Sequence, residues 1–91
     1  MSHNYRVLVR GGGLQRVIDG VGCRVGFFTS VFVRGSDEAA ACQTALDSLR
    51  SRLAENAALT ERTSLRVESI DQVNADSVPK VQPGLAYFRE P

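Results

Sequence analysis

Few residues in this chain are of the types that carry out acid–base, nucleophilic or metal chemistry. It has one histidine, His3, and two cysteines, Cys23 and Cys42. A structural zinc site usually takes four ligands of these types, so we expect no metal and no cofactor. His3 lies in an N-terminal stretch, residues 1–4, that we expect to fray. That position leaves no well-placed base for a Ser–His–Asp or Cys–His catalytic group.

The two cysteines differ in their sequence surroundings. Cys42 lies among apolar residues at helical spacing, which predicts a small core residue. Cys23 lies in a glycine-rich stretch beside Arg24. A neighbouring cation makes a thiol more reactive, so Cys23 is the candidate reactive thiol of the two, although an incidental loop cysteine is the favoured interpretation.

The glycine run 11–13 follows an expected strand, as phosphate-binding turns do. The match fails because Arg16 stands where the dinucleotide fingerprint has its third glycine, and no Walker lysine follows. We interpret the run as a flexible turn that ends the strand.

The acidic pairs do not indicate an active site. Asp37 and Glu38 suit a helix start, and Glu68 and Asp71 suit the flanks of a strand irregularity. Glycosidase-type chemistry needs two carboxylates facing a cleft, which a single small core does not predict. We therefore expect a protein that is not an enzyme.

Length and composition bound the class of protein. The 91 residues suit one domain over residues 1–91, and 43% hydrophobic with 23% charged residues is typical of a globular chain. The sequence shows no signal-peptide pattern and no apolar run of membrane-spanning length. We expect a cytoplasmic protein that does not bind membranes. A core this small gains from a partner subunit.

Arginine dominates the basic residues, and charge is uneven along the chain. Ten arginines stand against one lysine, Lys80, which indicates either guanidinium recognition or the codon usage of a GC-rich genome. Residues 1–34 carry a net +4 and residues 35–91 a net −3. This asymmetry can orient partners although the total is only +1.

Alternation and turn residues predict three strands and a possible fourth. The strands cover residues 5–10, 25–34 and 64–73, the last with a bulge near Glu68–Ser69. Residues 84–89 form a short closing edge strand or remain a loop. Residues 14–24 stay open between a helical turn and an extended segment.

A helix is expected over residues 37–57. Ser36 or Asp37 caps its start, and it ends between Asn56 and Thr60. Its apolar stripe is predicted from steps of three and four: Ala39, Cys42, Leu46, Leu49 and Leu53.

These elements predict an α+β fold of two layers, with a three- or four-stranded antiparallel sheet and one long helix (ββαβ or ββαββ). One helix covers one sheet face, so the opposite face keeps its side chains uncovered. Strand alternation assigns seven residues to that face: Leu8, Phe28, Phe32, Arg6, Arg10, Arg34 and Arg66. Phe88 is a further candidate.

Three interpretations of that face compete. Residues 14–24 or the proline-containing tail fold over it, or a homodimer forms through this face or a strand edge, or single-stranded nucleic acid stacks on its aromatic residues. We favour protein interaction, with a second copy in a homodimer or with another protein, over nucleic-acid binding, because the net charge is low and no RNA-binding signature is present.

The run from Val31 to Ala40, VFVRGSDEAA, resembles the strand–helix junction of HicB-type antitoxins and related small bacterial ββαβ domains. The likeness covers this junction and its surroundings. It implies a bacterial origin, a ββαβ architecture, oligomerisation and toxin neutralisation. The acidic-then-glycine hairpin of that family and its DNA-binding appendage are missing, so the resemblance transfers no site residue.

Overall fold

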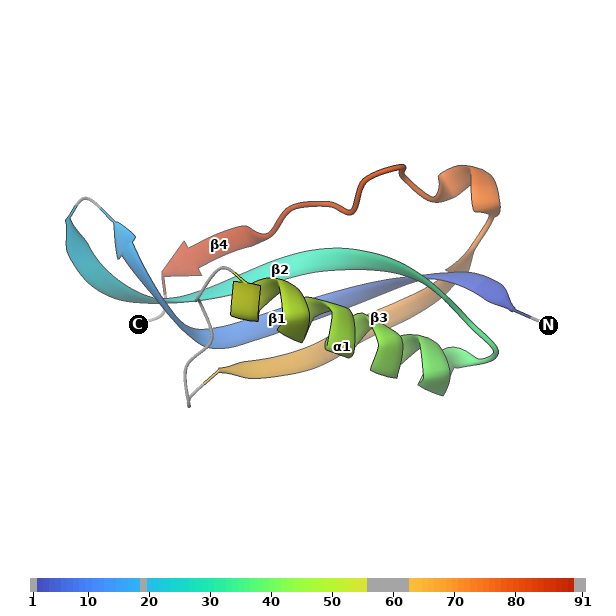
Figure 1. Ribbon diagram of the computed structural model, residues 1–91, viewed down its shortest axis with the longest axis horizontal. Helices are drawn as coiled ribbons and strands as arrows, with labels where there is room; N and C mark the ends of the chain where they lie inside the picture. Colours follow the sequence, from blue (N-terminus) through green and yellow to red (C-terminus); the bar gives the residue numbers. More distant parts are fainter. Residues whose placement is uncertain (1, 19, 56–62, 90–91) are drawn as a thin grey trace.

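The computed structural model describes residues 2–18, 20–55 and 63–89. The order is ββαββ with one short 3-10 turn before the last strand (Figure 1). The elements are β1 (His3–Ile18), β2 (Val21–Gly35), α1 (Glu38–Glu55), β3 (Ser64–Val73), η1 (Ala75–Ser77) and β4 (Ala86–Arg89). The α+β prediction is confirmed, and β4 confirms the closing edge strand.

All neighbouring strands of the sheet run antiparallel, in the order β3-β1-β2-β4. The two longest strands are thus central, and β3 and β4 lie at the edges. The molecule is elongated, 47 Å long and 23 Å across. Helix α1 lies along one face, and the chain after β3 passes the far end of the sheet at η1 before it returns beside β2 (Figure 1).

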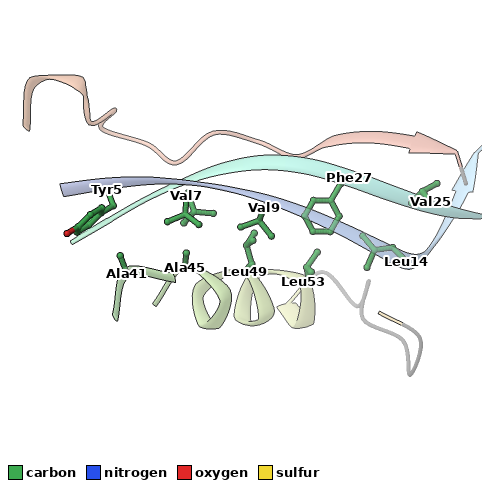
Figure 2. Packing of buried hydrophobic residues seen from close by; sticks show 11 residues of the cluster. Tyr5, Val7, Val9, Leu14, Val25, Phe27, Ala41, Ala45, Leu49 and Leu53 are labelled. Carbon is green, nitrogen blue, oxygen red and sulfur yellow. The ribbon is translucent and has the colours of Figure 1, made fainter. Parts of the chain in front are cut away.

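The core lies between α1 and the inward face of β1 and β2 (Figure 2). Strand alternation directs Tyr5, Val7 and Val9 inward together with Phe27 and Val31, all at most 5% exposed. The buried residues of the helix pack against them: Ala41, Ala45, Leu49 and Leu53. Removing this apolar area from water is the main stabilising contribution.

The helix presents a different stripe from the predicted one. Ala39 is exposed, and Cys42 and Leu46 are only half-buried, whereas Ala41 and Ala45 are fully buried. Small residues are needed here because the helix starts directly after β2, and a Cβ on Gly35 would crowd the backbone of Ala41. The first turns therefore approach the sheet too closely for large side chains.

Asp37 caps the helix, one of the two predicted capping residues. Its Oδ1 accepts a hydrogen bond from the backbone N–H of Ala40 at 2.8 Å, and its carbonyl accepts one from Ala41 at 3.0 Å. The predicted last residues of the helix, 56 and 57, and its end before Thr60 lie outside the described residues.

The prediction that the glycine run ends β1 is wrong. The strand continues to Ile18, and the register with β2 shifts between Gly11 and Leu14, where a bulge sits opposite Gly26. Gly13 has a φ of 75°, the left-handed conformation that a glycine adopts without strain. The extra residue shifts the phase of the alternation by one, so Leu14 faces the core, as Gly11 does, and is 0% exposed.

Residues 14–18 and 21–24 are extended. Leu14–Ile18 pairs with Val21–Val25 as the distal part of the β1–β2 hairpin, and β3 and β4 do not reach the pairs beyond Val25. This part forms a two-stranded arm. At the other end of the hairpin, the predicted fraying is wrong for His3 and Asn4, because β1 begins at His3 and both residues pair with β2.

The predicted bulge in β3 is confirmed. Leu8 of β1 pairs with Ser69, and the next residue, Val9, pairs with Val67. Glu68 is the extra residue. Because of it, both Val67 and Ile70 lie on the helix side, where they pack against the core.

Candidate interaction face

The seven residues assigned to the uncovered sheet face do share that face in the structure. On β1, Arg6, Leu8 and Arg10 alternate with the buried core residues. The register pairs Arg6 with Phe32 and Arg10 with Phe28 on β2, and Arg10 with Arg66 on β3. Directly opposed residues of an antiparallel pair point to the same side, so these side chains form one surface, with Arg34 beside Phe32 along β2.

Phe88 completes this surface, as the sequence suggested. It pairs with Gly26 across β2 and β4, and its ring centroid lies 5.4 Å from that of Phe28. We name the surface the aromatic–arginine face and define it by its members: Leu8, Phe28, Phe32, Phe88, Arg6, Arg10, Arg34 and Arg66.

Arg10 is the cation of the face that contacts its aromatic rings. Its guanidinium carbon lies 5.5 Å from the ring centroid of Phe28 and 5.6 Å from that of Phe88. Both distances suit a cation–π contact. The charge of Arg10 is thus held over the aromatic pair of Phe28 and Phe88.

Two other arginines of the face have carboxylate neighbours. Arg6 Nη2 donates to Asp71 Oδ2 at 3.1 Å, and Arg66 Nε lies 3.7 Å from Glu68 Oε1. The side chains are substantially exposed, so each pair adds little to stability. Their effect is to offset part of the positive charge on the face. Asp71 and Glu68, one of the acidic pairs in the sequence, are thereby accounted for.

The face keeps apolar area in contact with water. Phe28 is 39% exposed even with Arg10 over its ring, and Leu8, Phe32 and Phe88 are half-buried. The segments that were candidates to cover it lie elsewhere. The 14–24 arm extends the sheet, and the tail is held at the edge of β2.

The tail is held by its own Gln82 and by side chains of β2 and α1. The Gln82 amide bonds the backbone of Phe32, Thr29 Oγ1 donates to the carbonyl of Gly84 at 3.2 Å, and Arg52 Nη2 donates to that of Pro83 at 3.3 Å. Thr29 and Arg52 belong to the helix side, so these contacts hold residues 82–84 away from the aromatic–arginine face.

Cys23 has surroundings that differ from the prediction. It is half-buried, packs against the core from the helix side, and its Sγ lies 3.6 Å from the carbonyl oxygen of Val21. Arg24, the expected cationic neighbour, points to the other face by strand alternation. Arg24 therefore does not support the reactive-thiol hypothesis, and the reactivity of Cys23 stays a prediction.

Three further features bear on function: possible metal ligands, His3 and possible membrane-spanning helices. Within residues 2–18, 20–55 and 63–89, no three His, Cys, Asp or Glu side chains are grouped to hold a metal ion. His3 Nδ1 lies 3.2 Å from Gln72 Nε2 in the sheet. In the same part of the chain, no helix has the length and apolar character needed to span a membrane.

Sequence reasoning missed Gln82 and the arm. The arm had a signal in the dipeptide Asp19-Gly20 between Ile18 and Val21, because Asp-Gly favours two-residue hairpin turns, and Gly20 indeed has a φ of 80°. The role of Gln82 had no signal, because an isolated glutamine in a loop predicts nothing about its partner.

Comparison with known proteins adds no relative. No protein-family model matches the chain, and no curated protein or solved structure matches it significantly. The resemblance to HicB-type antitoxins therefore stays a prediction.

Proposed function

We propose that this chain is a non-enzymatic protein-interaction domain that forms a homodimer by stacking its aromatic–arginine face on that of a second copy. The observation that carries the proposal is Phe28, a large apolar side chain 39% exposed among three half-buried apolar neighbours. An apolar centre with a charged rim is typical of an interaction surface. Aromatic and arginine side chains are also the residues that most often dominate binding energy.

The charges of the face favour a protein partner. Arg6 and Arg66 have carboxylate neighbours, and Arg10 lies over two rings. This partial compensation lowers the repulsion between two identical faces. It also leaves fewer unengaged cations for phosphate groups.

The strand edges are less suited to a first contact. On β3 the bulge at Glu68 and the charges of Arg66 and Asp71 protect the edge, as such features do in natural sheets. On β2 the Gln82 side chain already occupies the backbone of Phe32. We therefore assign the dimer contact to the face.

A bacterial cytoplasmic setting belongs to the same proposal. Both cysteines are free thiols, which suits a reducing compartment. The arginine-rich composition suits a GC-rich genome.

Sedimentation velocity across a wide range of concentrations tests the homodimer. The unmodified chain is expected to reach twice its 9.9 kDa mass, and Phe28→Ser to remain a monomer. Tyr87→Ser is the matched control, because Tyr87 is similarly exposed at 42% but contacts Phe27 on the helix side. A monomeric unmodified chain at the highest concentration overturns the proposal, as does equal weakening by both substitutions.

Single-stranded nucleic acid is the second candidate, favoured by one observation. The Arg10 guanidinium over the tilted ring pair of Phe28 and Phe88, with exposed Arg34 and Arg66 on the same face, offers base stacking beside phosphate contacts. Titration with labelled oligonucleotides at low and moderate salt tests it. Binding that weakens steeply with salt supports it, and no binding at low salt excludes it.

A further inference from the structure

The Gln82 side chain occupies the edge of β2 as a neighbouring strand does. Its Oε1 accepts a hydrogen bond from the Phe32 N–H at 2.9 Å, and its Nε2 donates one to the Phe32 carbonyl at 2.7 Å. A primary amide offers the same donor and acceptor as a peptide group. One side chain thus satisfies both outward-facing backbone hydrogen-bonding groups of Phe32, its N–H and its C=O.

The rest of this edge follows from alternation. β2 pairs with β1 without interruption from Phe27 to Gly35, so Ser30 and Arg34 direct their backbone groups to the same side as Phe32. β4 pairs only with Val25–Phe28. The segment 30–34 is therefore a sheet edge covered by a side chain and a loop, and no strand among the described residues pairs with it on that side.

We propose that residues 30–34 of β2 form a strand-addition site for the same segment of a second copy, and that Gln82 is the internal cap that closes it. When the cap is withdrawn, the two segments pair antiparallel about Phe32. Each Phe32 then donates its N–H to, and accepts from, its counterpart. The proposal goes beyond the stacked homodimer, because it uses the edge of the sheet and not its face.

The register of this pairing is self-complementary. Centring on Phe32 places Val31 opposite Val33 on the helix side, and Ser30 opposite Arg34 on the other. Two Phe32 rings meet across the strands, a favourable aromatic pair. No two like charges are directly opposed, since each Arg34 faces a serine. The register also keeps every side chain on the face it already occupies.

The cap has the character of a displaceable contact. Both Gln82 hydrogen bonds are solvent-exposed, and the Gln82 side chain is exposed as well. Water can replace them at little cost in hydrogen bonding. The contacts of Thr29 with Gly84 and of Arg52 with Pro83 hold the same loop, so opening needs residues 82–84 to move as a unit.

The test is made in a Phe28→Ser background, so that it does not depend on the stacked face. Sedimentation velocity compares that chain with its Gln82→Ala derivative. The expected result is a shift from one copy to two on removal of the amide. Adding Ser30→Pro, which removes an outward N–H and is tolerated at a sheet edge, is expected to return the mass to one copy.

Gln82→Glu is the second variant, because it keeps the side-chain length but loses the donor to the Phe32 carbonyl. It is expected to dimerise at neutral pH as Gln82→Ala does. The proposal is overturned if both variants stay folded by circular dichroism and remain monomers at high concentration. It is also overturned if Ser30→Pro leaves the dimers intact, or if either Gln82 variant unfolds, since Gln82 is then a folding contact and not a cap.

Discussion

Phe88 and Gly26 are cross-strand partners in which the aromatic ring fills the space that a side chain on the glycine would need. They pair directly between β4 and β2, and a Cβ on Gly26 would overlap the outer atoms of the Phe88 ring. This contact brings Phe88 beside Phe28 and beneath Arg10. The glycine thus fixes the shape of the aromatic–arginine face.

Gly26→Ala is expected to destabilise the protein. The added methyl group must displace the Phe88 ring or the strand, and such overpacking costs about 1–3 kcal/mol. Chemical denaturation measures the free energy of unfolding. Gly22→Ala is the control on the same strand, because nothing lies within 4 Å of its Cβ position. Equal changes in the two variants would contradict the packing described for Phe88.

Two leucine substitutions on the helix distinguish the observed packing from the packing predicted from the sequence. Leu49 is fully buried against the sheet, whereas Leu46 is half-buried at the margin. Leu49→Ala is expected to lower the free energy of unfolding by about 2–5 kcal/mol. Leu46→Ala should cost clearly less, and thermal or urea unfolding ranks the two. The reverse ranking would show that the helix is rotated relative to this structure.

The helix cap gives a smaller, local effect. Asp37→Ala removes the acceptor for the Ala40 N–H and is expected to cost about 1 kcal/mol of stability. Asp37→Ser keeps an acceptor at the cap and should retain most of that stability. Urea unfolding of both variants compares them. No difference between alanine and serine would mean that the cap bond does not stabilise the helix.

The cation–π contact of Arg10 is testable by a double-mutant cycle. Arg10→Gln and Phe88→Leu are measured singly and together, and the expected coupling is about 0.5–1 kcal/mol, the range for exposed contacts. Arg50→Gln with Phe88→Leu is the control pair, because Arg50 is exposed on α1, on the opposite side of the sheet from Phe88. Additive effects in the Arg10 cycle would show that the guanidinium does not interact with the ring.

Local patterns were sufficient to predict much of the fold. Strand β3 was predicted with its bounds and its bulge, because the alternation of apolar and polar residues visibly changes phase between Val67 and Ile70. The helix start was predicted because Asp37 precedes a run without strand formers. The seven residues of the interaction face followed from alternation along three strands.

The remaining features depend on contacts between distant residues. The glycine run was expected to end β1, but the ring of Phe27 occupies the space over Gly11, and pairing with β2 carries the strand through the bulge. The helix stripe was assigned from apolar residues spaced three and four apart, which selected Ala39, Cys42 and Leu46 in place of Ala41 and Ala45. The close approach of the helix to Gly35 instead requires small residues at the buried positions of the first turns. The pattern of the helix alone does not reveal this approach.

The most direct test of the central claim is an isotope-filtered NMR experiment on a mixture of labelled and unlabelled copies. The stacked homodimer predicts intermolecular contacts from the ring protons of Phe28 and Phe88 to the unlabelled copy, with none from Tyr87. Intermolecular contacts that involve only Tyr87 or the arm would contradict it. The absence of any intermolecular contact, together with the mass of a single copy at the same concentration, would contradict it as well.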